Sequence, residues 1–135
     1  MRYLTLILAG LLIVGCQSRE STVFSGQTIE ISDTTLTAGC SDTVRFGRLH
    51  SGELGVKHLH LRNASSQTLV ITRHEVSCQC VRPEFERKPI KPGEEIPFDL
   101  RFDSRGEYGW QMKLLKLYNS ESSAPLKIYV EADVY

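Results

Sequence analysis

The stretch from Pro125 to Val134, PLKIYVEADV, decides the fold class. Apolar and polar residues alternate along it one by one, which is the pattern of a β-strand with one buried face. The apolar positions are Leu126, Ile128, Val130, Ala132 and Val134. Such a strand covers one half of a hydrophobic core, so other strands are expected to supply the rest.

Upstream, five further short runs are alternating or rich in β-branched residues. The two-residue period of a strand fits each of them better than the 3.6-residue period of a helix. They are Val44 to Leu49, Val56 to Asn63, Thr68 to Val76, Glu95 to Asp103 and Gly109 to Tyr118. Turn-forming residues separate the runs, as in His50-Ser51-Gly52 and Lys91-Pro92-Gly93. Short strands with turns about every 8 to 12 residues favour an all-β, immunoglobulin-like β-sandwich of about seven strands over a barrel.

The chain begins MRYLTLILAGLLIVGC, which has the order of a secretion signal. An early arginine precedes an apolar run from Leu4 to Val14, which is shorter than the roughly 20 residues needed to span a bilayer. The run ends in Ile13-Val14-Gly15-Cys16, which resembles the lipobox of bacterial lipoproteins, whose cysteine is acylated and becomes the first mature residue. We therefore expect residues 1–15 to be a lipoprotein signal peptide and Cys16 to carry the lipid anchor.

Removing residues 1–15 from the 135-residue chain leaves 120 residues, enough for one domain. Residues 16–39 are expected to hold the lipid anchor, a polar tether and a loosely patterned segment, and residues 40–135 the sandwich. The chain has 16 basic and 16 acidic side chains, and no basic excess indicates nucleic acid as a partner. We expect the protein on the bacterial cell envelope, in the outer membrane at its periplasmic or surface face, held to the membrane through the lipid on Cys16.

Three cysteines follow the signal peptide, Cys40, Cys78 and Cys80, and outside the cytoplasm thiols tend to be paired. A disulfide stabilises the fold by reducing the entropy of the unfolded chain. From loop length, this stabilisation is about 4 kcal/mol for a bond from Cys40 to Cys78 and about 1.6 kcal/mol for a bond from Cys78 to Cys80. In an extended strand the latter pair would also lie about 6.6 to 6.8 Å apart between Cα atoms, at the upper limit for a disulfide. We therefore expect Cys40 to pair with Cys78 or Cys80.

Two other interpretations of Cys78 and Cys80 stay open. In the first, they form a redox pair, which would require the backbone between them to fold into a tight turn. In the second, they bind zinc or copper together with His74, which offers three ligands where structural zinc sites usually take four.

Several short motifs follow one another in a recognisable order. They are Phe46-Gly47, Gly52, Asn63 at a strand end, Leu69-Val70-Ile71, Ser77-Cys78-Gln79-Cys80, Pro92-Gly93 and Phe102-Asp103. Over about residues 44–134 the chain resembles the bacterial domain of unknown function DUF1573, here preceded by a lipobox. The resemblance implies an exported immunoglobulin-like sandwich with no established biochemical activity. Gln79 stands where the family has glycine, and Cys40 matches no family position.

The sequence contains no Gly-x-Ser-x-Gly elbow, no phosphate-binding glycine loop and no His-Glu-x-x-His motif. We therefore expect no enzyme, no catalytic residue and no cofactor, but a lipid-anchored module that binds or scaffolds another envelope protein. The alternative is a thiol-redox or metal-handling envelope protein that uses Cys78 and Cys80. A weaker third candidate is carbohydrate binding through Trp110, with Tyr108 and Tyr118 as companions.

Overall fold

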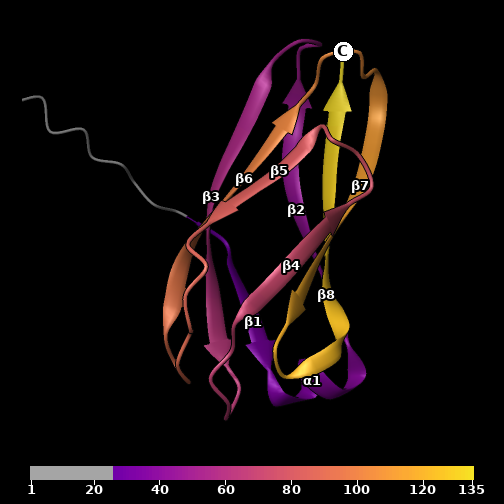
Figure 1. The fold of residues 1–135 in the computed structure, drawn as a ribbon. Helices are drawn as coiled ribbons and strands as arrows, with labels where there is room; N and C mark the ends of the chain where they lie inside the picture. Colours follow the sequence, from indigo (N-terminus) through magenta and orange to yellow (C-terminus); the bar gives the residue numbers. More distant parts are fainter. Residues whose placement is uncertain (1–25) are drawn as a thin grey trace, which may run out of the picture.

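The computed structural model describes residues 26–135, which form two four-stranded sheets packed face to face (Figure 1). The first sheet has the order β1-β3-β6-β5 and contains β1 (Thr28–Ser32), β3 (Leu54–Ala64), β6 (Glu95–Asp103) and β5 (Val81–Phe85). The second has the order β2-β8-β7-β4 and contains β2 (Cys40–Leu49), β8 (Ser122–Val134), β7 (Gly109–Asn119) and β4 (Ile71–Val76). The expected immunoglobulin-like sandwich is confirmed, with eight strands in the described part of the chain instead of about seven.

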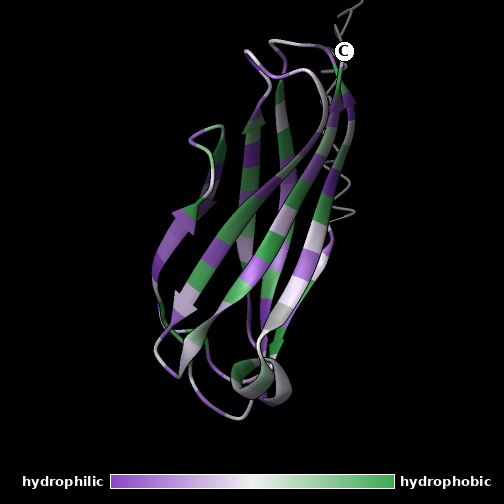
Figure 2. Ribbon diagram, turned by 90° about the vertical axis from the view of Figure 1, so that its right-hand side faces the viewer, coloured by the Kyte–Doolittle hydropathy of each residue, from purple (hydrophilic) through white to green (hydrophobic). Residues whose placement is uncertain are grey.

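The core lies between the two sheets and follows the alternation in the sequence. All five apolar positions of the Pro125 to Val134 stretch are buried, and Figure 2 shows hydrophobic and hydrophilic residues alternating along the strands. The largest fully buried side chains are Phe98 and Phe102, both in β6. Each side chain of this kind stabilises the fold by about 1.5 to 3 kcal/mol when it leaves water.

Residues 28–38, expected to be loosely patterned, form β1 and the short helix α1 (Asp33–Ala38) and belong to the sandwich. β1 pairs in parallel with β3 and buries Ile29 and Ile31. The helix begins with a reciprocal cap, in which Ser32 Oγ accepts from the N–H of Thr35 at 3.3 Å and Thr35 Oγ1 accepts from the N–H of Ser32 at 2.8 Å. The domain therefore begins ahead of the expected boundary, and α1 carries the chain from one sheet to the other.

The Phe46-Gly47 motif bends β2 where this strand pairs in parallel with β8. The register shifts between Arg45 and Gly47, and Gly47 has a φ of 73°, a left-handed conformation that suits glycine. The Phe46 ring packs 5.9 Å from the ring of Phe102, between centroids. Because of the bulge, Arg45 and Arg48 both reach the outer face of the sheet.

Asn63, at the end of β3, is fully buried and forms hydrogen bonds with two different loops. Its Nδ2 donates to the carbonyl oxygens of Gln67 at 2.7 Å and Ile90 at 2.8 Å, and its Oδ1 accepts from the N–H of Ser65 at 2.9 Å. A buried amide with these partners joins the β3–β4 loop to the segment before β6.

β4 and β5 lie at the edges of different sheets, and the chain passes from one sheet to the other between them. β5 is not among the strands expected from the sequence, because it is short and contains Pro83. An edge strand accommodates proline, since one side of it needs no ladder hydrogen bonds. Within residues 26–135, no helix has the length and apolar character needed to cross a bilayer.

Candidate functional site

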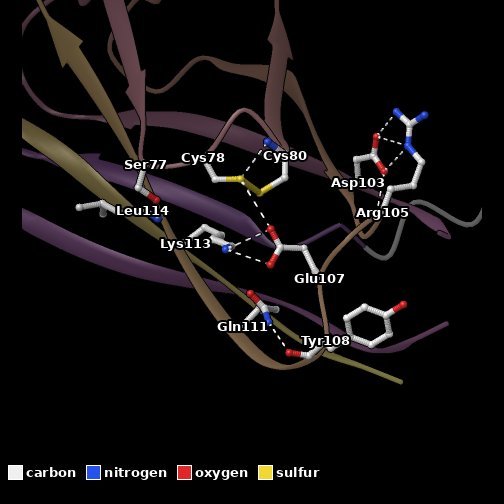
Figure 3. A network of polar contacts seen from close by, with 10 residues as sticks. All are labelled: Ser77, Cys78, Cys80, Asp103, Arg105, Glu107, Tyr108, Gln111, Lys113 and Leu114. Carbon is white, nitrogen blue, oxygen red and sulfur yellow. Dashed lines mark hydrogen bonds and ion pairs between the residues drawn. A yellow bond between two sulfur atoms is a disulfide. The ribbon is translucent and has the colours of Figure 1, made fainter. Parts of the chain in front are cut away.

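The connection between β4 and β5 contains a disulfide between Cys78 and Cys80 (Figure 3). The chain turns here, and the N–H of Val81 donates to the carbonyl oxygen of Cys78 at 3.2 Å. The turn brings the two Cα atoms to 5.1 Å, within the ordinary range for disulfides. Both cysteines are half-buried, and Cys80 packs against the edge of the core.

This bond corrects the expectation that Cys40 pairs with Cys78 or Cys80. The expectation assumed an extended backbone between Cys78 and Cys80, whereas the turn shortens their separation. The backbone of Cys40 lies at the start of β2, beside α1 at the bottom of Figure 1, and the β4–β5 connection lies in the upper half. Loop-closure entropy describes the unfolded chain, and it does not determine which cysteines the native fold brings together.

Ser77 holds the turn against β7. Its N–H donates to the carbonyl oxygen of Leu114 at 2.9 Å, and its Oγ accepts from the N–H of Leu114 at the same distance. These two hydrogen bonds extend the β4–β7 pairing by one residue. The turn is therefore positioned by Ser77 as well as by its own disulfide.

Glu107 and Lys113 complete a polar cluster beside the disulfide (Figure 3). Oε1 of Glu107, in the β6–β7 connection, lies 3.9 Å from Sγ of Cys78. Nζ of Lys113, in β7, lies 3.3 Å from both carboxylate oxygens of Glu107, and the two side chains are only 19% and 22% exposed. On its other side, Sγ of Cys78 accepts the N–H of Cys80 at 3.1 Å. One sulfur thus has both an amide donor and a carboxylate next to it.

His74 does not join the cysteines, so the expected ligand set of His74, Cys78 and Cys80 is not assembled. Its side chain is exposed on β4, with Nδ1 3.5 Å from Nη2 of Arg87. The structure instead groups Cys78 and Cys80 with Glu107, whose ligand atoms all lie within 4.8 Å of one another. This set could hold a metal only after reduction, because thiolates and not disulfide sulfurs are metal ligands.

A second candidate site lies on the outer face of the β2-β8-β7-β4 sheet. Trp110 and Met112 in β7 are 60% and 48% exposed, and Tyr108 in the preceding connection is 73% exposed. Nε1 of Trp110 donates to Oε1 of Glu131 at 3.1 Å, which orients the indole ring. Large apolar side chains gathered at the surface mark binding sites more often than isolated ones do.

Arginine and carboxylate side chains border Trp110 on β2 and β8. Arg45 pairs with Glu131 at 3.2 Å and Arg48 pairs with Asp133 at 3.5 Å, measured from Nε to the carboxylate oxygen. A shallow hollow of about 170 Å³ lies beside Trp110 and is lined in part by the small residues Gly47 and Ala132. The β-bulge thus leaves open a space that a larger side chain would fill.

Tyr118, expected as a companion of Trp110, is covered. The guanidinium of Arg73 lies 3.5 Å from the centre of its ring, and its hydroxyl donates to Oε2 of Glu75 at 3.1 Å. The hydrogen bonds from Arg73 and Tyr118 lower the pKa of Glu75 below its ordinary value. Tyr118 is therefore part of a surface network with Arg73 and Glu75. The ring face that Arg73 covers is not open to a ligand.

The sequence analysis does not single out Glu107 or Lys113. Glu107 is separated from Cys78 by 29 positions, and no spacing rule links a loop carboxylate to a distant cysteine pair. Two strand pairings bring them together: β4 with β7, extended by Ser77 and Leu114, and β5 with β6, extended by the hydrogen bond from the N–H of Asp103 to the carbonyl oxygen of Cys80. Cys16, expected to carry the lipid, lies outside the described residues.

Fold and site together define a protein class: an immunoglobulin-like β-sandwich with a short-range disulfide where the chain passes between its sheets. The chain belongs to the family described as protein of unknown function (DUF1573), whose model matches residues 38–134. No curated protein matches the chain.

Two solved structures share the fold at low sequence identity. One is a protein of unknown function from Porphyromonas gingivalis W83, with a TM-score of 0.59 and 18% identity over 69% of this chain and 44% of that one. The other is the VesB protease of Vibrio cholerae, with a TM-score of 0.55 and 13% identity over 73% of this chain and 33% of that one. The chain thus spans less than half of either, and these similarities concern the fold alone.

Proposed function

We propose that this protein is a lipid-anchored binding module of the bacterial cell envelope that contacts another envelope protein through the surface around Trp110. The observation that carries the proposal is the exposure of Trp110 and Met112 on the outer face of β7, with exposed Tyr108 in the connection just before this strand. Tryptophan, tyrosine and arginine are the residues that most often dominate protein interfaces. The module performs no chemistry on its partner at this face.

The contacts of the face support a protein partner. Arg45 and Arg48 are already paired with carboxylates of β8, so their charges are balanced, and the guanidinium of Arg48 is held 4.2 Å from the centre of the Tyr135 ring. Trp110 stands beside a hollow of about 170 Å³. This volume is enough for one side chain of a partner protein and is too small to enclose a larger ligand. An apolar anchor surrounded by paired charges is the usual arrangement of an interface centre and rim.

Site-specific photo-crosslinking in the bacterial envelope tests the proposal. A photoreactive residue at Met112 should give a covalent adduct of defined mass with one envelope protein, and the same residue at Val56, 36% exposed on the outer face of the other sheet, should not. Changing Trp110 to alanine in the Met112 probe strain should reduce the adduct at least about tenfold, the loss expected for an interface residue worth more than 1.4 kcal/mol. Equal adducts at both positions, or none at Met112, would refute the binding face.

Anchoring is tested separately by changing Cys16 to serine. The variant should leave the membrane fraction if the lipid on Cys16 is the anchor. The crosslinking partner can then be compared between anchored and released protein, which shows whether binding needs the membrane.

The thiol-redox alternative is also supported by a specific observation. Cys78 and Cys80 are joined to each other, and a half-buried ion pair lies against one of their sulfurs.

A further inference from the structure

The Cys78–Cys80 disulfide contributes little to the stability of the fold. It joins residues only two positions apart, and closing so short a loop removes little entropy from the unfolded chain. The turn is also held by the two hydrogen bonds between Ser77 and Leu114, which do not involve the sulfurs. The site can therefore keep its position on β7 when the disulfide is reduced.

The two sulfurs have different surroundings. Cys80 packs against the edge of the core, whereas Sγ of Cys78 lies between the N–H of Cys80 at 3.1 Å and the carboxylate of Glu107 at 3.9 Å. The N–H donor stabilises negative charge on Cys78, whereas an ionised carboxylate opposes it, so Glu107 favours cleavage only by delivering a proton to the departing sulfur. Cys78 is thus the better leaving group when the disulfide is attacked.

From this geometry we propose that Cys78 and Cys80 form a redox-active disulfide that exchanges with a protein dithiol, and that Glu107 transfers the proton of Cys78. Lys113 is a positioning residue, since it contacts Glu107 and keeps the carboxylate turned toward the sulfur. This activity does not depend on Trp110, which lies on the outer face of β7, whereas Lys113 lies on the opposite face of the same strand.

The exchange proceeds in two steps. A thiolate of the dithiol attacks Sγ of Cys80, the bond between the cysteines breaks, and its electron pair goes to Sγ of Cys78. This sulfur receives a proton through Glu107, which takes one from water. The second thiolate of the dithiol then attacks the sulfur bound to Cys80, and Cys80 leaves as a thiolate that is protonated by water. The dithiol is oxidised to a disulfide by two electrons, and the cysteine pair is reduced to two thiols.

Other charges lie around the cluster. Lys113 faces Glu107 from β7, and the cysteines face it from the β4–β5 turn. Near the end of β6, Asp103 interacts with Arg105 and, more weakly, with Arg82. Asp103 and Arg105 are hydrogen-bonded to each other (Figure 3). Lys113 is therefore the cation that contacts Glu107.

The test measures reduction of the disulfide in the full-length protein by dithiothreitol, with rapid alkylation and mass mapping of the peptide that contains Cys78 and Cys80. We expect reduction under native conditions and a rate about 10- to 100-fold lower in Glu107→Gln, since proton transfer typically contributes 10²–10⁴-fold and the sulfur contact here is long. Glu84→Gln removes a carboxylate of β5 that pairs with Arg101, and it should stay within about twofold of the unmodified protein.

Further variants separate proton transfer from a structural effect. Glu107→Asp should recover part of the rate, because it retains a carboxylate and shortens the side chain by one methylene. Lys113→Met should lower the rate and Lys113→Arg should restore part of it, because only the arginine keeps a cation in contact with the Glu107 carboxylate. If Lys113→Met acted only by loosening the fold, Lys113→Arg would not restore the rate.

Three results would overturn the proposal. The first is a disulfide that is reduced only after the protein unfolds in urea. The second is an equal rate in the unmodified protein and in Glu107→Gln, both folded by circular dichroism. The third is stoichiometric binding of zinc, added as zinc chloride, by the reduced protein with loss of all exchange, which would make Cys78, Cys80 and Glu107 a metal site.

Discussion

Replacing Ile128 with alanine tests which face of β8 closes the core. Ile128 is 0% exposed and lies opposite Leu115 of β7 in the strand register. The change removes about three carbon atoms, and about 0.8 kcal/mol per methylene gives a transfer loss of roughly 2.4 kcal/mol. The cavity left in a close-packed core adds to this, so we expect a total loss of about 2 to 5 kcal/mol in the free energy of unfolding.

The neighbouring residue supplies the control. Tyr129 lies on the outer face of the same strand, half-buried and opposite Leu114. Its replacement by alanine leaves no closed cavity, so the loss should be clearly smaller, about 1 kcal/mol. Ile128→Val should fall between the two, at about 0.5 to 1.5 kcal/mol, because most of the side chain is kept.

Urea unfolding followed by far-ultraviolet circular dichroism measures all three variants. Fluorescence is a poorer probe, because the single tryptophan, Trp110, is exposed in the folded protein and changes its surroundings little on unfolding. Similar dependence on urea in each variant shows that the same surface is exposed. Equal losses for Ile128→Ala and Tyr129→Ala would refute the assignment of faces.

Three other outcomes are expected. Asn63→Ala should cost about 2 to 5 kcal/mol in urea unfolding, because it removes four hydrogen bonds of a buried amide and leaves the N–H of Ser65 without its acceptor, and a loss below about 1 kcal/mol would contradict that role. Mass spectrometry of the membrane fraction should find Cys16 acylated at the mature N-terminus, and any other N-terminus would exclude the anchor. Hydrogen bonds from Arg105 lower the pKa of Asp103. The pair should therefore stabilise the fold fully above the pKa of an aspartate in the unfolded chain. This stabilisation should be lost as the pH falls through the lower pKa of Asp103 in the folded protein, and Asp103→Asn should remove the pH dependence.

Much of the fold follows from local patterns. The alternation from Leu126 to Val134 predicts the buried face of β8 correctly, because successive side chains of a strand point to opposite faces whatever the strand pairs with. The predicted turns at Gly52 and Gly93 occur where expected, since both glycines have positive φ angles. Local patterns did not predict α1 or β5, which are short, and placed β1 in a loosely patterned segment although its residues alternate.

The sequence by itself therefore determined the class of fold and the inward face of its clearest strand. Tertiary structure decided that Cys78 pairs with Cys80 and not with Cys40, and that Glu107 and Lys113 stand beside the bond. It also decided that Trp110 is exposed. The physical reason is that side-chain direction is a local property with a period of two residues, whereas contact between distant residues depends on strand order and register, which only the packed sheets establish.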